Sequence, residues 1–174
     1  MNFIRASFLT KNTHTYMSTT INASQKTIFS KILVAIDCSD ASMDAADYAI
    51  FISKQHNAEL LYALHVIHPA DVDLFGPTGE TSAGAAYYTI DMNKEAQEYL
   101  DKDKDKASEK NIQVKTEIIA STNIAGGIVD YAEDKDVDLI VIGTRGKSGF
   151  KKILLGSVVS KVVTYAHCPV MVVK

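Results

Sequence analysis

The sequence predicts an α/β fold, an open and mostly parallel sheet of five strands with helices on both faces. Short apolar runs rich in β-branched residues alternate along the chain with longer segments whose apolar residues recur at helical spacing. The stretches between successive strands are long enough to hold a crossover helix, which parallel pairing requires. The composition is that of an ordinary globular domain, with 47% hydrophobic and 22% charged residues in a chain of 174.

The first three elements are expected to form a βαβ unit. The apolar run Ile32–Ile36 predicts a buried strand, and Ser39 or Asp40 is placed to cap a helix that runs to about Gln55. A second strand is predicted at Glu59–Ile67. The two strands should therefore be parallel, and their crossover should be right-handed.

The middle of the chain is expected to hold a loop and a long helix. Glycine and proline are frequent between His68 and about Ile90, which predicts a surface loop. Helical spacing predicts a helix from Asp91 to about Lys110. The alternating charges of 101–106 are expected on a solvated face of that helix, in ion pairs that contribute about 0.3–0.5 kcal/mol each.

The remaining elements complete the alternation of strands and helices. A strand with one wetter face is expected at 112–119, and a short helix, weakened by Gly126-Gly127, at 124–135. The last three predicted elements are a strand at 137–142, a helix at 157–165 and a closing strand at 169–173. Periodicity alone does not set the order of the strands in the sheet.

The most informative motif follows the fourth predicted strand. Gly143-Thr-Arg-Gly146 is followed, after nine residues, by Gly156-Ser157 at the start of the last predicted helix. Glycine lets main-chain N–H groups come close to phosphate oxygens, and a helix N-terminus favours an anion. Ser157 lies where an N-cap is expected, and its hydroxyl could serve a phosphate instead.

Two commoner nucleotide motifs are excluded by spacing. A Walker A loop requires a glycine five residues before Gly146, where this chain has Val141 inside a strand. The dinucleotide fingerprint is excluded because the chain contains no G-x-G. The remaining pattern, G-x2-G-x9-G-S, resembles the nucleotide-binding signature of the ATP-binding subgroup of the universal stress protein family, and the resemblance extends from about Lys31 to Lys174.

The resemblance implies an adenine nucleotide alpha hydrolase-like fold with strand order 3-2-1-4-5. The ligand would lie at the carboxyl ends of strands one and four, where the winding of the chain reverses. The family also implies a homodimer joined in part through the terminal strand near Val170–Val173. A physical reason supports the dimer, because an apolar strand at an uncovered sheet edge invites pairing.

Three residues are expected beside the base and ribose. Asp37 follows the first strand and can accept hydrogen bonds from ribose hydroxyls, although a turn or helix-capping aspartate is the alternative. Ala35 is small enough for a flat base to lie near it. Val66 matches the position where family members hold adenine, although packing in the core is equally compatible with it.

The phosphates are expected to meet main-chain amides from two segments. Gly143 and Gly146 form the first, and Gly156, Ser157 and Val158 form the second. Either Arg145 or Lys147 can add positive charge. We favour Arg145 because a guanidinium fork suits phosphate oxygens.

No catalytic residue and no protein metal ligand are predicted. His65 and His68 do not share a strand face and lack a carboxylate cluster, and Ser157 lacks His–Asp helpers. Mg²⁺ or Mn²⁺ would arrive with ATP, held by phosphates and water.

The function that the resemblance implies is therefore ATP binding, or AMP in its place, by a sensor or regulatory module of the stress response. The alternative is a slow ATP hydrolase or phosphotransfer enzyme that uses the same cradle, with Asp37 or a residue of the 68–90 loop as its base. Related flavoprotein or adenylation-type domains are less favoured, because they need a larger chain or a partner subunit.

Charge and composition limit the partners and the location. A net charge of −3 and a pI near 5.9 argue against general nucleic-acid binding. No apolar run reaches transmembrane length, so no membrane association is expected. Residues 1–28 are expected to be a polar, partly mobile extension of a domain at 29–174, with Met17 as an alternative start to Met1. The extension lacks the apolar core of a secretory signal, and Cys38 and Cys168 suit free thiols, so a cytoplasmic location is expected.

Overall fold

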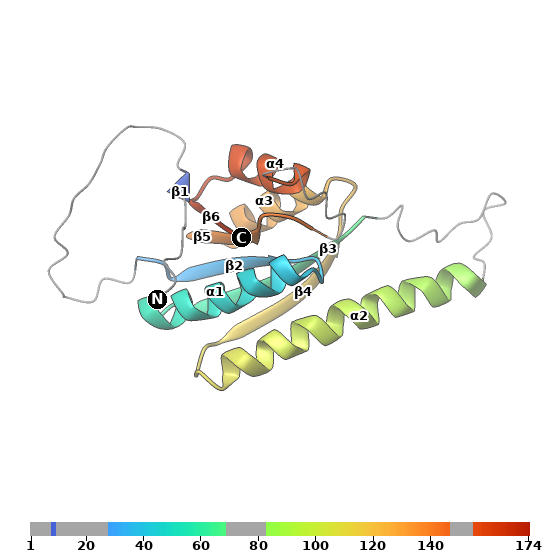
Figure 1. Cartoon of the computed structure of the whole chain (residues 1–174), viewed down its shortest axis with the longest axis horizontal. Helices are drawn as coiled ribbons and strands as arrows, with labels where there is room; N and C mark the ends of the chain where they lie inside the picture. Colours follow the sequence, from blue (N-terminus) through green and yellow to red (C-terminus); the bar gives the residue numbers. More distant parts are fainter. Residues whose placement is uncertain (1–7, 10–27, 69–82, 147–154) are drawn as a thin grey trace, which may run out of the picture.

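The computed structural model describes residues 8–9, 28–68, 83–146 and 155–174, and for 8–9, 83–93 and 95 it describes the main chain alone. These residues form one twisted sheet in the order β1-β6-β5-β2-β3-β4 (Figure 1). The strands are β1 (Phe8–Leu9), β2 (Lys31–Ile36), β3 (Leu60–Ile67), β4 (Val114–Ala120), β5 (Leu139–Gly143) and β6 (Val170–Val173). The strands from β2 to β6 are all parallel, and their order confirms the expected 3-2-1-4-5 arrangement.

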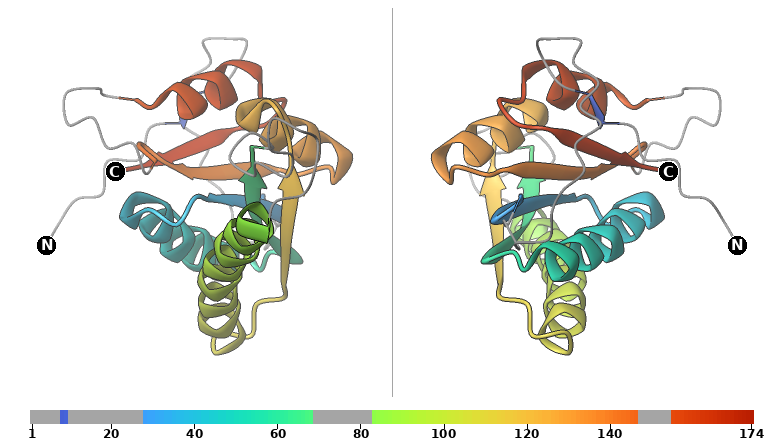
Figure 2. Two further views of the ribbon diagram at one scale, coloured as in Figure 1. Left: turned by 90° about the vertical axis from the view of Figure 1, so that its right-hand side faces the viewer. Right: turned by 90° about the vertical axis from the view of Figure 1, so that its left-hand side faces the viewer.

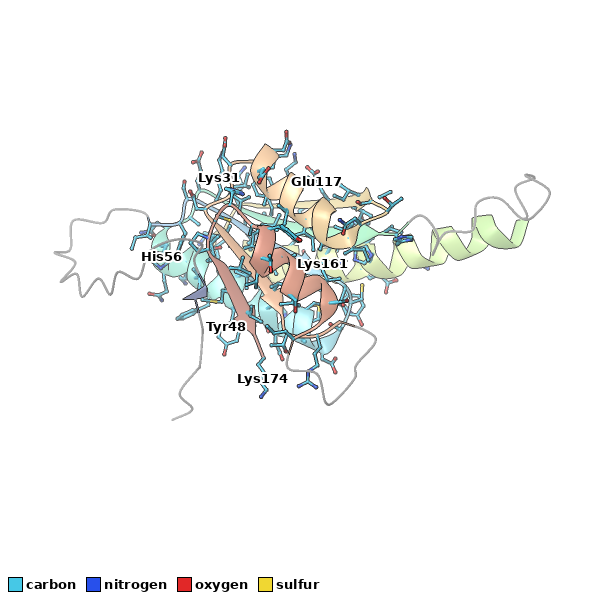
Figure 3. All side chains as sticks on the ribbon, turned by 90° about the horizontal axis from the view of Figure 1, so that it is seen from above. Lys31, Tyr48, His56, Glu117, Lys161 and Lys174 are labelled. Carbon is cyan, nitrogen blue, oxygen red and sulfur yellow. The ribbon has the colours of Figure 1, made fainter. Side chains whose placement is uncertain are left out.

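Helices cover both faces of this sheet, as predicted. On one face lie α1 (Asp40–His56) and α2 (Ala83–Ser108), and on the other lie α3 (Ile124–Asp134) and α4 (Ser157–Tyr165) (Figures 1 and 2). The amino-terminal part of α2 extends beyond the sheet, which is also clear when the molecule is seen from the α4 side (Figure 3). The carboxyl-terminal part of α2 therefore provides its packing surface.

The sheet separates two apolar layers. Along β2, Ile32 and Val34 face α1 and α2, whereas Leu33 and Ala35 face α3 and α4, because successive strand side chains point to opposite faces. All four are buried. This central strand is apolar on both faces, as expected of a strand covered by helices on each side.

The start of α1 confirms its predicted cap. The hydroxyl of Ser39 accepts a hydrogen bond from the Ser42 N–H at 3.3 Å, and the Ser42 hydroxyl accepts one from the Ser39 N–H at 3.2 Å. This capping box satisfies two amides that have no partner within the helix. The helix ends at Asn57 in the left-handed conformation, with φ 50°.

The start of α2 corrects a prediction. Residues 83–90 were expected in a loop, but the helix begins at Ala83 rather than at Asp91. Three alanines in 83–90 favour a helix, and Gly84 costs only about 1 kcal/mol relative to alanine, so the glycine did not mark a boundary. The rest of the predicted loop, at 69–82, lies outside the described residues.

The β6 edge also differs from expectation. It was expected to be uncovered, but β1 pairs with it in antiparallel orientation, with Phe8 opposite Met171 and Leu9 opposite Val170. The outer edge of the sheet is therefore covered over these two residues of β6, by a strand from the polar amino-terminal segment.

Candidate functional site

A pocket lies at the carboxyl ends of β2, β3 and β5, with a cavity volume of about 430 Å³. The chain leaves β2 for α1 on one face of the sheet, and after β5 it continues to α4 on the other face. Adjacent strands whose connections go to opposite faces leave a crevice between them, which is where open α/β sheets bind ligands.

Nine residues were predicted to contact a ligand, and all nine line this pocket. They come from the ends of β2 and β3, from the turn after β5 and from the start of α4: Ala35, Asp37, Val66, Gly143, Arg145, Gly146, Gly156, Ser157 and Val158. Lys147, the alternative to Arg145 as a source of charge, lies outside the described residues.

Asp37 holds the turn that follows β2. Its Oδ1 accepts hydrogen bonds from the Ser39 N–H at 3.1 Å and from the Ser39 hydroxyl at 2.5 Å. Its Oδ2 lies against Gly146, where an added Cβ would collide with it. The alternative role of a turn aspartate is therefore observed, and the same carboxylate also borders the glycine turn of the pocket.

The two turn glycines have different surroundings. A Cβ at Gly143 would lie 2.6 Å from the main-chain oxygen of Ala41, so the absence of a side chain lets β5 approach the first turn of α1. A Cβ at Gly156 would lie 3.5 Å from the oxygen of Thr144, an ordinary contact. Packing within the chain therefore explains why position 143 requires glycine, but it does not explain the glycine at position 156.

Ser157 is not the N-cap of α4, which corrects the prediction by one residue. Gly156 is the N-cap, and its N–H donates to the Thr144 oxygen at 2.9 Å. Glycine is among the accepted N-cap residues, and here no side chain caps the helix. Ser157 becomes the first helical residue, exposed at the mouth of the pocket.

Several pocket residues were not predicted. Ile124 and Ile128 come from the first turns of α3, and Leu64, Ile142 and Val159 add to the same apolar wall. Since α3 follows β4 in a parallel sheet, its start had to lie at the carboxyl edge, and this topology was the available signal. Close approach of α3 is helped by Gly127, where a Cβ would lie 2.9 Å from the Ser121 Cβ.

A family model describes this chain well. The model of the universal stress protein family matches residues 29–174. The chain belongs to the universal stress protein family.

Relatives and a solved structure agree with this assignment. The chain is 41% identical over 160 residues to Universal stress protein MJ0531 of Methanocaldococcus jannaschii, covering 91% of this chain and 90% of that protein. It is 40% identical over 150 residues to Universal stress protein YxiE of Bacillus subtilis, covering 84% of this chain and all of that protein. The structure of MJ0577, another Methanocaldococcus jannaschii protein, superposes with a TM-score of 0.74 at 29% identity, covering 84% of this chain and 96% of the other.

Few charged side chains line the pocket of this universal stress protein. Asp37 is the one carboxylate, and Arg145 the one guanidinium, among the described residues that line it. The His65 ring nitrogen Nδ1 lies 2.7 Å from the Ile36 oxygen, so a main-chain contact occupies this imidazole. No group of three or more His, Cys, Asp or Glu side chains in the described parts of the chain could hold a metal ion. The described lining thus combines an apolar wall with one carboxylate, one guanidinium and the glycines near the end of β5 and the start of α4.

Proposed function

We propose that this universal stress protein binds an adenine nucleotide, ATP or AMP in its place, and acts as a nucleotide-dependent sensor or regulatory module in a stress response. The observation that carries the proposal is the convergence of all nine predicted residues on one pocket, from segments far apart in the sequence. Their types divide into an apolar part, a carboxylate and a glycine turn beside a helix N-terminus. These three parts match the base, the ribose and the phosphates.

The base would lie against the apolar wall. Val66, Ile124 and Ile128 line this side, and Ala35 leaves room beside β2. Burial of a flat aromatic base against such side chains is favourable by about 25 cal/mol per Å² of apolar surface. The main chain at the end of β3 would complete recognition of the base edge.

The ribose and phosphates would lie toward α4. Asp37 would accept hydrogen bonds from ribose hydroxyls, since an ionised carboxylate can accept several hydrogen bonds at once. The amides of the glycine turn and the first turn of α4 would hold the phosphates, since the amides of a helix N-terminus have no partner within the helix. Arg145 would neutralise part of the charge.

Two structures of this fold have been determined with nucleotides. One is a universal stress protein in complex with cAMP, with a TM-score of 0.63 at 24% identity. The other is the Archaeoglobus fulgidus protein in complex with dAMP, with a TM-score of 0.58 at 23% identity. At these identities they establish the fold alone, so the proposal for this chain rests on its own pocket.

Mg²⁺ or Mn²⁺ would be held by phosphates and water. A divalent ion prefers several oxygen ligands, and Asp37 is the sole carboxylate among the described lining residues. This donor set fits an ion that arrives with the nucleotide better than a resident metal. A titration with and without MgCl₂ should therefore change affinity for ATP more than affinity for AMP.

The test is calorimetric titration of the full chain with ATP and AMP. Gly156→Val should weaken ATP binding at least tenfold while the melting temperature stays close to wild type, since the residue has φ −66° and a Cβ there would make only ordinary contacts. Ser160→Ala, at an exposed position of α4 outside the pocket lining, is the matched control and should bind normally. Absence of binding by the wild-type protein, with divalent ion present, would refute the proposal.

The same samples test the enzymatic alternative. Steady release of phosphate from ATP that is lost with Gly156→Val would favour a slow hydrolase or phosphotransfer enzyme. Binding without turnover would favour the sensor. Mass spectrometry of any ligand released by denaturation would distinguish ATP from AMP directly.

We also propose that the chain forms a homodimer through the outer edge of β6 and works in the cytoplasm. Val172 lies beyond the two β6 residues that β1 covers, so part of that edge can accept another strand. Among the described residues, no helix has the length and apolar character needed to cross a bilayer.

A further inference from the structure

A carboxylate occupies a core position of α2. Ala96, Leu100, Asp103 and Ala107 follow one another at spacings of four, three and four residues, so they lie on one face of the helix. All four are buried, and Asp103 is only 3% exposed. An aspartate therefore lies where the helical pattern calls for an apolar side chain.

Asp103 has no partner that compensates its burial. Within the described residues, neither of its carboxylate oxygens has a hydrogen-bond partner. The cation that acts on it, Lys106 of the same helix, instead pairs with Asp47 of α1 at 2.7 Å, where both side chains are largely exposed. A buried charge without a hydrogen bond is costly, and such a group lowers the cost by taking up a proton.

The strands beneath α2 offer no charge to balance it. Leu61 and Ala63 of β3 belong to the same apolar layer as Leu100 and Ala107, and Val114 and Ile118 of β4 pack against that layer. Thr116 faces the same way by alternation and carries no charge. His65 shares this face of β3, but its ring contacts the Ile36 oxygen at the carboxyl end of the strand.

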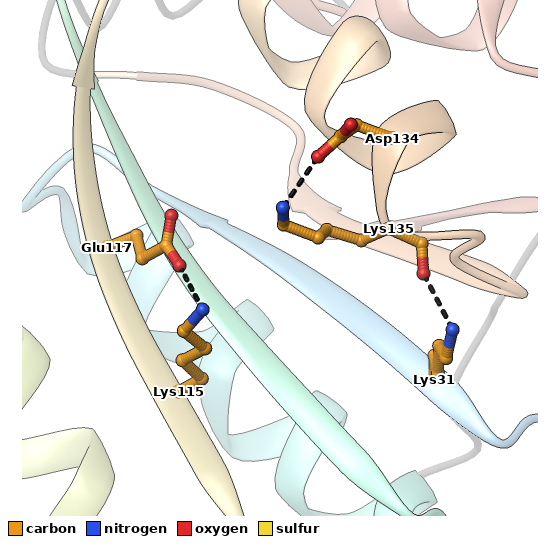
Figure 4. A network of polar contacts seen from close by, with 5 residues as sticks. All are labelled: Lys31, Lys115, Glu117, Asp134 and Lys135. Carbon is orange, nitrogen blue, oxygen red and sulfur yellow. Dashed lines mark hydrogen bonds and ion pairs between the residues drawn. The ribbon is translucent and has the colours of Figure 1, made fainter.

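The charged residues of β4 point away from α2. Lys115 and Glu117 lie on the opposite face of the strand, where they pair with each other at 2.7 Å (Figure 4). From α1, Asp47 faces Asp103, and Asp44 acts on Lys106. The charges that act on Asp103 are thus Lys106, which is already paired with Asp47, and Asp47 itself, which repels the carboxylate.

We propose that Asp103 is a proton-sensitive latch for α2. With a neutral carboxyl group, the carboxyl-terminal half of α2 packs firmly on α1 and the sheet. With an ionised carboxylate in the same place, this half of the helix packs more loosely. The protein would therefore tighten the α1–α2 side of its fold as the surroundings become acidic.

The direction of the pH effect follows from the two states. Burial raises the pKa of Asp103 from 3.8 to about 6; Lys106 opposes this shift and Asp47 adds to it. The folded protein thus binds the proton about 100-fold more tightly than the unfolded chain does. The stabilising effect is fully present below the unfolded pKa near 3.8 and is lost as the pH rises through about 6.

Urea unfolding of the full chain between pH 7.5 and pH 5 tests this. Asp103→Asn keeps the shape of the neutral carboxyl group without titrating, so it should unfold at higher urea than wild type at pH 7.5. The ratio of the wild-type to the Asp103→Asn unfolding constant should fall about tenfold from pH 7.5 to pH 5. Asp101→Asn and Asp105→Asn, at exposed positions of the same helix, should keep the wild-type profile.

Hydrogen exchange locates the effect. The protection factors of amides in 96–108 should rise in the wild-type protein on going from pH 7.5 to pH 5.5, and should be nearly constant in Asp103→Asn. A carbon-detected NMR titration should show the midpoint of the Asp103 carboxyl group well above 3.8, the ordinary value for an aspartate. If the unfolding constants of wild type and Asp103→Asn changed with pH in the same way, or if the Asp103 carboxyl group titrated with an ordinary midpoint, the proposal would be overturned.

Discussion

Asp138, just before β5, is bonded in both directions to Lys31, the first residue of β2. Its Oδ2 accepts a hydrogen bond from the Lys31 N–H at 2.8 Å, and its own N–H donates to the Lys31 oxygen at 2.8 Å. The same Oδ2 accepts a second bond from the Ser30 N–H at 2.8 Å. These contacts join the two central strands at their amino ends and fix the register that places Asp37 beside the glycine turn.

Asp138→Ala should lower the free energy of unfolding by about 1–3 kcal/mol, because two partly buried N–H groups lose a charged acceptor. Asp138→Asn retains an acceptor oxygen and should cost less. Urea unfolding at pH 7.5 measures both changes. Asp130→Asn, at an exposed position of α3, serves as the control, and equal midpoints for Asp138→Ala and Asp130→Asn would contradict this account.

The two turn glycines should respond differently to the same added methyl group. Gly143→Ala should destabilise the fold by about 1–3 kcal/mol, because its Cβ would press on the rigid main-chain oxygen of Ala41. Gly156→Ala should change stability by less than about 0.5 kcal/mol, since the loss of a favourable N-cap is offset by a stiffer unfolded chain. Thermal unfolding of the two variants without nucleotide decides the matter, and equal losses of stability would count against it.

Because only Gly143 is required by packing, variants of the two glycines differ in what a loss of nucleotide binding would mean. Loss of nucleotide binding in a Gly143 variant would be explained by its damaged packing against α1. Loss in a Gly156 variant that keeps its melting temperature would report on the pocket itself.

The two cysteines should differ in reactivity. Burial raises the pKa of the Cys168 thiol to about 11, so about one molecule in a thousand carries the reactive thiolate at pH 8. Cys38 lies in the lining of the pocket. Iodoacetamide at pH 8 should therefore modify Cys38 first, and ATP should slow that modification if it binds as proposed.

Peptide mass spectrometry with and without ATP measures both rates, and Cys38→Ser is the control that should leave only slow labelling. As long as the pH is below the pKa of Cys168, its labelling rate should increase about tenfold for each unit by which the pH is raised. Equal labelling of Cys38 with and without saturating ATP would mean that the nucleotide lies elsewhere.

Local patterns predicted most of the fold, because the central strands β2 and β5 are apolar on both faces and α1 carries its own capping box. The start of α2 could not be predicted in this way. Gly84 suggested a loop, whereas neighbouring alanines favour a helix, and the two preferences are close in energy. The strand β1 was also missed, because a two-residue strand has no periodicity to detect.

The part of the pocket formed by the glycine motif was predicted from the sequence. The part formed by side chains that packing brings together was missed. Gly143, Gly146 and Gly156 form a pattern with a chemical reason and could be found directly. Ile124 and Ile128 reach the pocket only because α3 begins beside the end of β3, and nothing in their local sequence marks them. Asp103 could have been found by noticing that helical spacing places a carboxylate in an apolar stripe.

The pairing of β1 with β6 leads to a prediction about assembly. The N–H groups of Ile140 and Thr144 in and after β5 donate to the oxygens of Pro169 and Val173. The main-chain N–H and C=O groups of successive residues in a strand point alternately to its two sides. Those of Val170 therefore point away from β5, toward the outer edge, where Leu9 lies directly opposite. A second copy that pairs with β6 would have to displace β1 at this residue.

Leu9→Pro removes an amide that β1 presents to Val170 and should weaken this cover. If a dimer forms through β6, its dissociation constant should fall about ten- to fiftyfold in the variant, because each of the two protomers loses one competing hydrogen bond of about 1 kcal/mol. Sedimentation velocity from 1 to 100 μM protein measures the constant. Leu9→Ala, which keeps this amide, is the control and should change the constant less. A weaker dimer in Leu9→Pro would mean that β1 supports assembly rather than competing with it, and monomers throughout would refute the dimer itself.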